Sequence, residues 1–536
     1  MSAPHDVSRL ARSAGVIGAA TLASRVLGLV REQVMAYLFG AGNAVDAFNI
    51  AFRIPNLVRD LFAEGAMSAA FVPTFTRVLT REGKPAAWRL GNHVVNALLV
   101  STVVMVGLGI LFAHPLVIAL AGDYSAIPGK VDLTVELTRT MLPFLVFVAI
   151  AAAMMGMLNS LDRYLVSAMA PAVFNVCSIA CTLALVPLLT RMGWPTILAM
   201  AFGVLAGGLG QVMIQWPALS REGYRYQPVL NLREPGLRDV LILMGPGTLG
   251  LAATQVNVFV NTWLATSQGT GAVSWLNYAF RLMYLPLGLF GASIATVSVP
   301  AIARRAAERD FDGLRRTLSS GVAMMLALTI PATLGLMVLA RPIVALLFER
   351  GRFTPADTES TAAALVCYAV GLAGYSIVKV ATPTFYAIGQ SRTPVVVSTV
   401  IVAVNAVLNV MMVRRFGYTG LAIGTSISAL ANAILLLYLL RERLGPLNGR
   451  RLLTVSIRML GASLVMSFVA WGVERQLALA LPGHGLAMEL VRVGSAIVAG
   501  LAMLTLLARM LHVSEFTEIV RALMSRIASG EARQDV

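Results

Sequence analysis

Apolar runs of about 20 residues recur from one end of this chain to the other, and that is the length an α-helix needs to cross a bilayer. Hydrophobic residues make up 57% of the 536 residues, and charged residues only 13%. In lipid every backbone polar group must be paired within the protein, and a helix pairs them within one segment. We therefore predict an all-α polytopic membrane protein with about 14 transmembrane helices. Their approximate cores are 15–38, 47–76, 91–121, 137–160, 164–189, 195–218, 238–266, 273–302, 318–347, 360–388, 393–413, 418–440, 452–474 and 486–511.

The basic residues outside these spans concentrate in alternate loops. A net charge of +16 could by itself suggest nucleic acid, but most of the excess lies in the loops at 77–89, 221–238, 304–316 and 441–451. Cytoplasmic loops of membrane proteins carry such an excess. The loops on the other side hold few Lys or Arg, with Arg350 and Arg352 as an exception. We therefore expect both termini in the cytoplasm, a retained first span and no nucleic-acid partner.

An internal repeat organises the chain. AVDAFNIAFR at 44–53 and AVSWLNYAFR at 272–281 agree at six positions with a constant offset of 228. This offset carries the first span onto the seventh, across an even number of spans, so the two copies have the same orientation in the membrane. We predict two six-helix lobes, related by an axis along the membrane normal, with two extra helices at the end. The predicted divisions are 1–222, 223–444, 445–512 and a cytoplasmic amphipathic tail at 513–536.

Five arginines interrupt the apolar spans. A guanidinium at mid-bilayer costs roughly 2.5–3.5 kcal/mol, so about five facing lipid would oppose insertion by on the order of 10–18 kcal/mol. They must face a polar interior, which predicts a water-filled cavity between the lobes for an anionic substrate. Arginine suits phosphate because its planar donors bind two oxygens at once and it keeps its charge. The five are Arg25, Arg31, Arg53, Arg59 and Arg281, of which Arg53 and Arg281 are equivalent in the repeat.

A structural explanation of these arginines competes with the functional one. Each could be a paired ion or a residue that extends to the interface. Candidate acids lie nearby at Glu32, Asp46, Asp60 and Glu64, and Asp46 shares a helical face with Arg53.

Three further residues could contribute to a site. Lys379 in the tenth span is expected to be buried, where it could couple an ion, contact substrate or pair with a distant acid. Ser24 and Ser274 could donate hydrogen bonds to substrate, but serines that pack helices are at least as common.

The sequence shows no pattern typical of catalysis or of a metal site. Cys177, Cys181 and Cys367 lie within apolar segments without a CxxC pair, and the five histidines are scattered. GPGTLG at 245–250 lacks the lysine and the spacing of a phosphate loop. We expect a transporter without a cofactor, although a coupling ion stays open.

Four segments closely resemble the MurJ (MviN) family of lipid II flippases. They are SRVLGLVRE at 24–32, FGAGNAVDAF at 39–48, PNLVRDLFAEGAMSAAFVP at 55–73 and SWLNYAFRLM at 274–283. The resemblance covers essentially the whole chain. It implies a fold of the MOP superfamily and the transfer of lipid II, the undecaprenyl-pyrophosphate-linked peptidoglycan precursor, to the outer leaflet of the bacterial inner membrane.

The resemblance also assigns residues. The family's cavity arginines match Arg25, Arg31, Arg59 and Arg281, its essential acid matches Asp46, and a cavity position that is Lys or Arg matches Arg53. The last two helices would form a groove for the lipid tail, and we expect a monomer in contact with membrane lipids.

One position departs from the family pattern. The family carries Asp immediately before the arginine equivalent to Arg281, whereas this chain has Phe280. A mechanism that needs an acid there is therefore in doubt for this chain. The alternatives are a flippase for another lipid-linked oligosaccharide, a multidrug exporter of the same superfamily, and a polyprenyl-phosphate transferase or phosphatase. Exporters of cations need acidic cavities, and the enzymes need catalytic acids or a metal motif that the sequence lacks.

Overall fold

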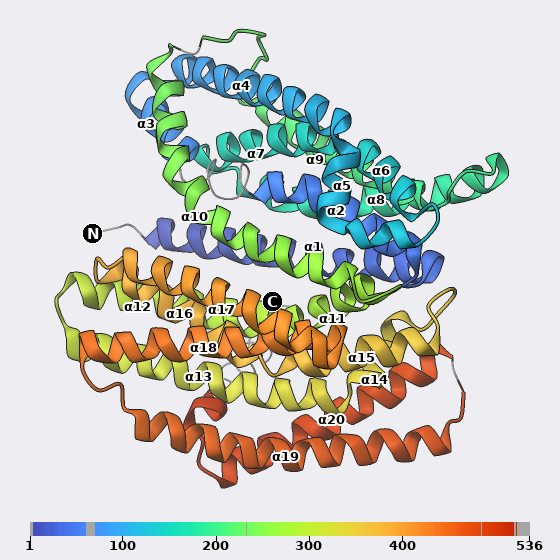
Figure 1. The fold of residues 1–536 in the computed structure, drawn as a ribbon. Coiled ribbons are helices and arrows are strands. Elements are labelled where there is room, and N and C mark those ends of the chain that lie inside the picture. The colour runs from blue at the N-terminus through green and yellow to red at the C-terminus, as the bar shows by residue number, and fades with distance from the viewer. Residues whose placement is uncertain (1–3, 61–69, 232, 484, 519–520, 522–536) are drawn as a thin grey trace, which may run out of the picture. The chain divides into compact units, whose positions relative to one another are not determined.

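The computed structural model describes residues 4–60, 70–231, 233–483, 485–518 and 521, and these residues are helical apart from turns and short connections (Figure 1). By its contacts the chain divides into two compact units, Met1–Ser274 and Trp275–Val536. The all-helical prediction is confirmed for the described residues.

The first unit contains ten α-helices among its described residues and a short 3-10 helix. α11 (Ala272–Pro286) begins in this unit and continues into the second. The helices of the first unit are α1 (Pro4–Phe39), α2 (Asn43–Arg59), α3 (Val72–Glu82), α4 (Lys84–Leu111), α5 (Ala113–Ala121), η2 (Gly122–Ala126), α6 (Lys130–Met141), α7 (Phe144–Ser160), α8 (Tyr164–Met192), α9 (Leu198–Arg221) and α10 (Pro235–Thr266).

The second unit continues α11 through a π-helical turn, η3 (Leu287–Gly291). The helices that follow are α12 (Ala292–Ala307), α13 (Phe311–Val338), α14 (Ala340–Phe348), α15 (Pro355–Ala369), α16 (Leu372–Ala387), α17 (Arg392–Phe416), α18 (Tyr418–Leu444), α19 (Gly449–Ala480) and α20 (Leu486–Met510).

Among the described residues, nine helices are long and apolar enough to cross a membrane, or up to 11 if each of two bent pairs is one span. The predicted spans at 15–38, 47–76 and 238–266 have no counterpart among these helices. The second of them runs through residues 61–69, which lie outside the described part. The number 14 therefore stays a prediction, whereas the polytopic helical fold is clear.

The repeat and the contacts divide the chain at different points. The repeat assigns α10 to the second lobe, whereas α10 packs against α3, α4 and α5 in the first unit. The predicted lobe boundary after residue 222 stays a prediction of the repeat.

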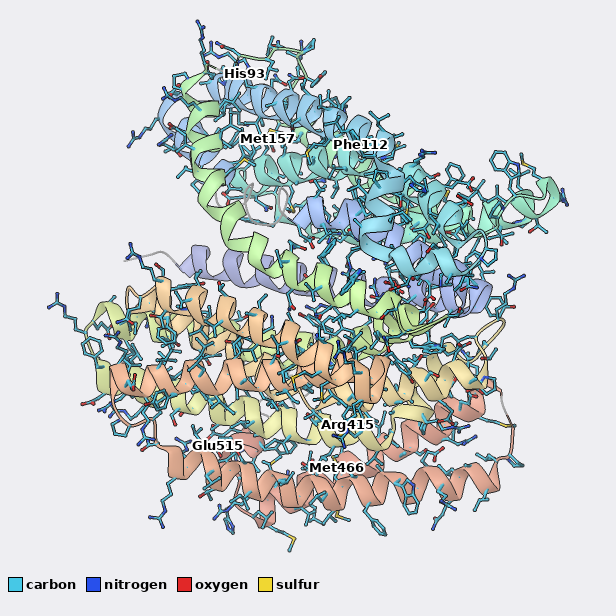
Figure 2. The ribbon with its side chains drawn as sticks, in the orientation of Figure 1. His93, Phe112, Met157, Arg415, Met466 and Glu515 are labelled. Atoms are coloured by element: carbon cyan, nitrogen blue, oxygen red, sulfur yellow. The ribbon has the colours of Figure 1, made fainter. Side chains whose placement is uncertain are left out.

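Aromatic side chains fill the core of the first unit at one end. Phe71, Phe75 and Met157 are fully buried there, and Figure 2 shows Met157 among these helices. Gly156 makes room for Phe71, because a Cβ at this glycine would lie 2.9 Å from the Phe71 ring. At the same end, Glu222 accepts hydrogen bonds from Lys84 and Arg163, which ties the beginnings of α4 and α8 to the end of α9.

The last two helices pack on the outside of the second unit, where α19 contacts α13 and α20 contacts α14 (Figure 1). Gly500 allows close approach, because a Cβ there would lie 3.4 Å from Met466, which Figure 2 labels on α19.

One ion pair joins the same helices to the rest of the unit, and a second joins α19 to the segment after α20. Arg350 pairs with Glu489 at 3.1 Å, and the arginine is 31% exposed. Arg451 pairs with Glu515, which follows α20, at 2.8 Å. The exception to the loop-charge pattern is thereby partly explained, since the charge of Arg350 is balanced by an acid on a neighbouring helix. Of the predicted tail at 513–536, only residues 513–518 and 521 lie in the described part.

Candidate functional site

Of the predicted residues of α1, Ser24 and Arg31 lie beside α8, whereas Arg25 is exposed. The carbonyl of Ser24 accepts a hydrogen bond from Asn175 of α8 at 3.2 Å, and Ser24 is half-buried. A Cβ at Gly28 would lie 3.7 Å from the same amide, so the glycine lets α8 approach closely. The guanidinium-bearing side chain of Arg25 is exposed. In the structure Ser24 thus takes part in helix packing through its backbone.

Arg31 is the most buried of the predicted arginines, at 9% exposure. It donates a hydrogen bond to Glu32 at 3.0 Å, and its guanidinium lies 5.4 Å from the centre of the Phe174 ring. Phe174 reaches this place because α9 has Gly207 beneath it, where a Cβ would lie 2.5 Å from the ring. A planar cation over an aromatic face can still donate hydrogen bonds from its edge, as Arg31 does to Glu32.

α2 carries two more predicted arginines, and Pro55 lies between them. Arg59 donates from two of its nitrogens to Asp60, at 3.1 and 2.8 Å, and both side chains are about one third exposed. Arg53 is half-buried. Acids adjacent in sequence therefore balance Arg31 and Arg59, which confirms part of the structural explanation for these two residues.

Asp46 is fully buried and collects four hydrogen bonds. It accepts from Lys130 of α6 at 3.1 Å, from the backbone N–H of Gly271 at 2.7 Å, and from Ser274 through its N–H at 3.1 Å and its hydroxyl at 2.7 Å. The ammonium of Lys130 also lies 3.8 Å from the centre of the Tyr124 ring. The ion pair is almost completely excluded from solvent, with side-chain exposures of 1% and 0%.

The geometry makes Asp46 a cap for α11. The first N–H groups of a helix have no partner within the helix, and the side chain of the preceding residue usually accepts from them. That residue here is Gly271, whose φ of +91° favours glycine and which has no side chain to offer. The carboxylate comes instead from α2, and it also lies in the first turn of its own helix. It therefore faces two helix N-termini, both of which favour negative charge.

This contact joins the two copies of the repeated motif. Asp46 and Ser274 are separated by the repeat offset of 228, so equivalent positions bind each other directly. Beside them Thr270 donates to Asn43 at 2.9 Å, and Asn49 donates to Ser274 at 3.4 Å. We name the group Asp46, Lys130, Gly271 and Ser274 the capping cluster.

Two predicted residues of this region have partners within the protein. Ser274, predicted as a donor to substrate, is fully buried and gives its hydroxyl to Asp46. Asp46 pairs with Lys130, which the sequence analysis did not single out. A signal was present, since Lys130 is the one basic residue in AGDYSAIPGKVD, a loop otherwise free of Lys and Arg. The partner itself could not be read from the sequence, because it lies 84 residues away.

The second unit holds Arg281 and Lys379, and both side chains are exposed. The expectation that Lys379 is buried is therefore wrong. Its stem runs beside the π-helical turn η3, where a Cβ at Gly291 would lie 3.3 Å from the lysine Cδ. A mid-helix Gly leaves open the space that this long side chain uses to reach the surface.

Phe280 joins a cluster of tyrosines. Its ring centre lies 4.9 Å from that of Tyr284, 5.3 Å from Tyr368 and 6.5 Å from Tyr375. Aromatic packing therefore occupies the position where the family pattern has an acid, which gives a physical reason why the fold tolerates the change.

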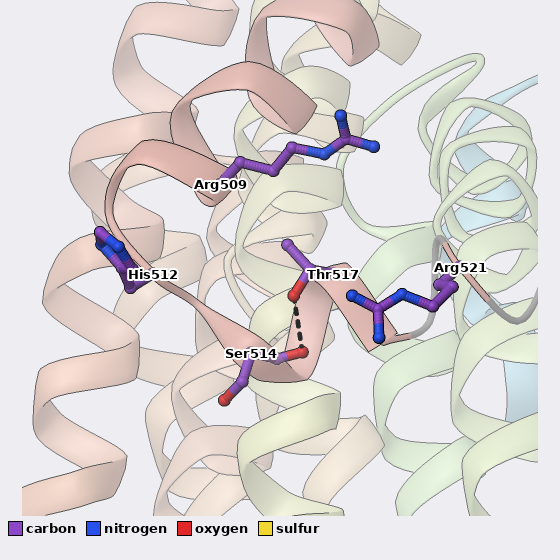
Figure 3. Close-up of a pocket in the computed structure, with 5 residues that line it drawn as sticks. All are labelled: Arg509, His512, Ser514, Thr517 and Arg521. Atoms are coloured by element: carbon purple, nitrogen blue, oxygen red, sulfur yellow. Dashed lines mark hydrogen bonds between the residues drawn. The ribbon is translucent and has the colours of Figure 1, made fainter.

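A surface hollow of ≈ 380 Å³ lies beyond the end of α20 (Figure 3). None of the predicted site residues lines it. In Figure 3 Thr517 and Ser514 are joined by a hydrogen bond within one turn, where the Thr517 hydroxyl donates to the Ser514 carbonyl at 3.0 Å. Among the described residues no group of three or more His, Cys, Asp or Glu could hold a metal ion.

Comparison with known proteins identifies the family. The sequence model described as "Lipid II flippase MurJ" matches residues 35–488. A probable lipid II flippase MurJ of Vibrio cholerae is 38% identical over 437 residues, which cover 80% of this chain and 82% of the relative. The lipid II flippase MurJ of Burkholderia cenocepacia is 34% identical over 451 residues, covering 83% of this chain and 87% of the relative.

Solved structures share the fold. A lipid II flippase MurJ in an inward closed conformation has a TM-score of 0.74 at 24% identity and covers 92% of this chain and 99% of its own. An inward-facing multidrug resistance MATE transporter of the MOP superfamily has a TM-score of 0.65 at 17% identity, over 80% of this chain and 96% of its own. With the family model matched over most of its length, this chain belongs to the MurJ family of lipid II flippases.

Proposed function

We propose that this protein moves lipid II from the inner to the outer leaflet of the bacterial cytoplasmic membrane by alternating access. The family match over residues 35–488 supports the substrate. The observation that carries the proposal is the buried guanidinium of Arg31, one of the four predicted site arginines on the consecutive helices α1 and α2. Buried cations in a membrane helix are costly unless they serve an anionic ligand or a pair, and a pyrophosphate is such a ligand.

Each arginine has a role in this proposal. Arg25, Arg31, Arg53, Arg59 and Arg281 bind the pyrophosphate, with planar donors directed at its oxygens. Binding must be reversible, and the acids beside two of the arginines lower the net positive charge that the ligand meets.

The remaining predicted residues divide into two groups. Asp46 and Ser274 act on the fold of α11 rather than on the substrate, because their polar atoms are used within the capping cluster. Ser24 and Lys379 stay candidate contacts to the substrate or a coupling ion.

The proposal also includes the orientation of the protein in the membrane and the path of the lipid tail. Both termini lie in the cytoplasm in this proposal, as the loop charges indicate. The lipid tail stays in the membrane along α19 and α20, and the protein acts as a monomer without a cofactor. A multidrug exporter is not favoured, because the embedded residues of α1 and α2 are mainly basic.

The test uses bacterial cells depleted of their own MurJ-family flippase and supplied with this protein. Lipid II in the outer leaflet is measured by its cleavage with an enzyme added outside the cells. The wild-type protein should restore cleavage, and Arg31→Ala should reduce it by roughly 10-fold or more, because an interaction with phosphate is lost. Arg77→Ala is the matched control, since Arg77 is 49% exposed and pairs with Asp239 away from the site. Outer-leaflet lipid II that does not depend on the wild-type protein would contradict the proposal.

A further inference from the structure

The capping cluster contains Lys130, to which the proposed transport function gives no role. Lys130 begins α6, which packs along α2, and its side chain is held between the Asp46 carboxylate and the Tyr124 ring. The lysine is 3% exposed. Its position is therefore fixed by packing as well as by charge.

The other partners of Asp46 sit on a different kind of support. The loop after α10 contains two glycines with positive φ, +90° at Gly269 and +91° at Gly271, and Ser274 lies in the first turn of α11 after this loop. Directly after Ser274 the chain leaves the first unit. The carboxylate thus has one partner on a packed helix and two where a short loop enters α11, Gly271 in the loop and Ser274 in the first turn of the helix.

The strength of the cap depends on the charge of Asp46. Hydrogen bonds to an ionised acceptor are roughly twice as strong as neutral ones. A buried carboxylate without a counter-charge is costly and tends to take up a proton, which converts it into a weaker acceptor. In the described part of the chain the titratable groups that bear on Asp46 are Lys130 and Tyr124. Only the lysine can supply a positive charge.

We propose that Lys130 is a positioning residue that keeps the Asp46 carboxylate ionised, so that Asp46 can release and recapture the first turn of α11. When Gly271 and Ser274 move away, the Lys130 pair remains and the carboxylate stays ready to bind them again. This deepens the proposed transport function and rests on it for its biological meaning, but the test below needs no lipid II.

The first measurement follows closure of the cap in the full-length protein. Cysteines replace Asn43 and Thr270, which contact each other beside the cluster, in a background with Cys177, Cys181 and Cys367 changed to alanine. The rate of cross-linking by a short thiol reagent is compared among variants. Lys130→Met should slow it by roughly 10-fold, because the cap loses its charge-assisted hydrogen bonds. The double variant Asp46→Asn with Lys130→Met should give the same slow rate, since Asn mimics the neutral acid.

The second measurement detects the proton itself. Infrared spectra should show a new band of a protonated carboxylic acid in Lys130→Met, and this band should be absent when Asp46→Asn is added. Lys130→Gln, which is polar but uncharged, should give the same band and keeps the test informative if the methionine variant does not fold. Lys84→Met is the control, because Lys84 also pairs with an acid at 3.0 Å but is 52% exposed.

The outcomes separate the two proposals. Wild-type cross-linking in Lys130→Met, or no carboxylic acid band in either lysine variant, would overturn the role of Lys130 whatever the protein transports. A confirmed band together with outer-leaflet lipid II that is independent of this protein would refute only the transport function. We expect cross-linking to slow equally in Lys130→Met and in the double variant Asp46→Asn with Lys130→Met. The carboxylic acid band should be present in the first and absent in the second.

Discussion

Replacing Ser274 by alanine removes its hydrogen bond to Asp46 from the cap of α11, together with the longer hydrogen bond that Asn49 donates to the same hydroxyl. The serine is fully buried, its hydroxyl donates to Asp46 at 2.7 Å, and alanine fits the same space. The carboxylate keeps Lys130 and the N–H groups of residues 271 and 274. A hydrogen bond to a charged group contributes about 1.5–3 kcal/mol, so opening of the cap should become easier by roughly 10- to 150-fold.

Amide hydrogen exchange measures this opening directly. The N–H groups of Gly271 and Ser274 are protected by Asp46, and their exchange reports the free energy of local opening. Exchange in a peptide spanning these residues should accelerate by that factor in Ser274→Ala, with the rest of the first unit unchanged. Ser101→Ala is the control, because the hydroxyl of Ser101 only donates to a carbonyl of its own helix. Equal exchange in Ser274→Ala and wild type would show that the serine hydroxyl does not hold the cap.

Three further predictions concern charge. Hydrogen bonds from Lys84 and Arg163 hold the pKa of Glu222 below its usual 4.5, so the stability that they give is present at neutral pH and is lost as the pH falls below about 4.5. In Glu222→Gln the melting temperature of the protein should therefore depend less on pH in that range. Arg350→Ala should lower the free energy of unfolding of the second unit by about 1–2 kcal/mol in denaturant titrations, whereas Arg341→Ala, whose ion pair is 61% exposed on both sides, should stay within about 0.5 kcal/mol. A cysteine at Thr270 should react with an impermeant thiol reagent outside intact cells and one at Arg221 should not, and the reverse pattern would invert the proposed topology.

The sequence alone predicts that five arginines lie within apolar spans and need polar surroundings, because charged residues stand out in an apolar run. Arg31 interrupts an apolar run whatever its neighbours are, and its cost in lipid demands a polar partner. The repeat likewise follows from the printed letters, but the hydrogen bond between its equivalent positions Asp46 and Ser274 does not. The acids beside Arg31 and Arg59 were also within reach, since sequence neighbours on a helix remain close in space.

What the tertiary structure decided is which distant groups meet. Asp46 could have faced Arg53, which lies about two helical turns further along α2, but the packing of α2 against α6 places Lys130 beside it. Lys379 was predicted to be buried, but its side chain is exposed beside Gly291. Phe280 packs against three tyrosines, and the periodicity of the sequence does not predict these contacts. Hydropathy and spacing specify that a helix is apolar and which residues share its face. They do not specify which helix that face meets, because the choice depends on the summed packing of many small contacts across the fold.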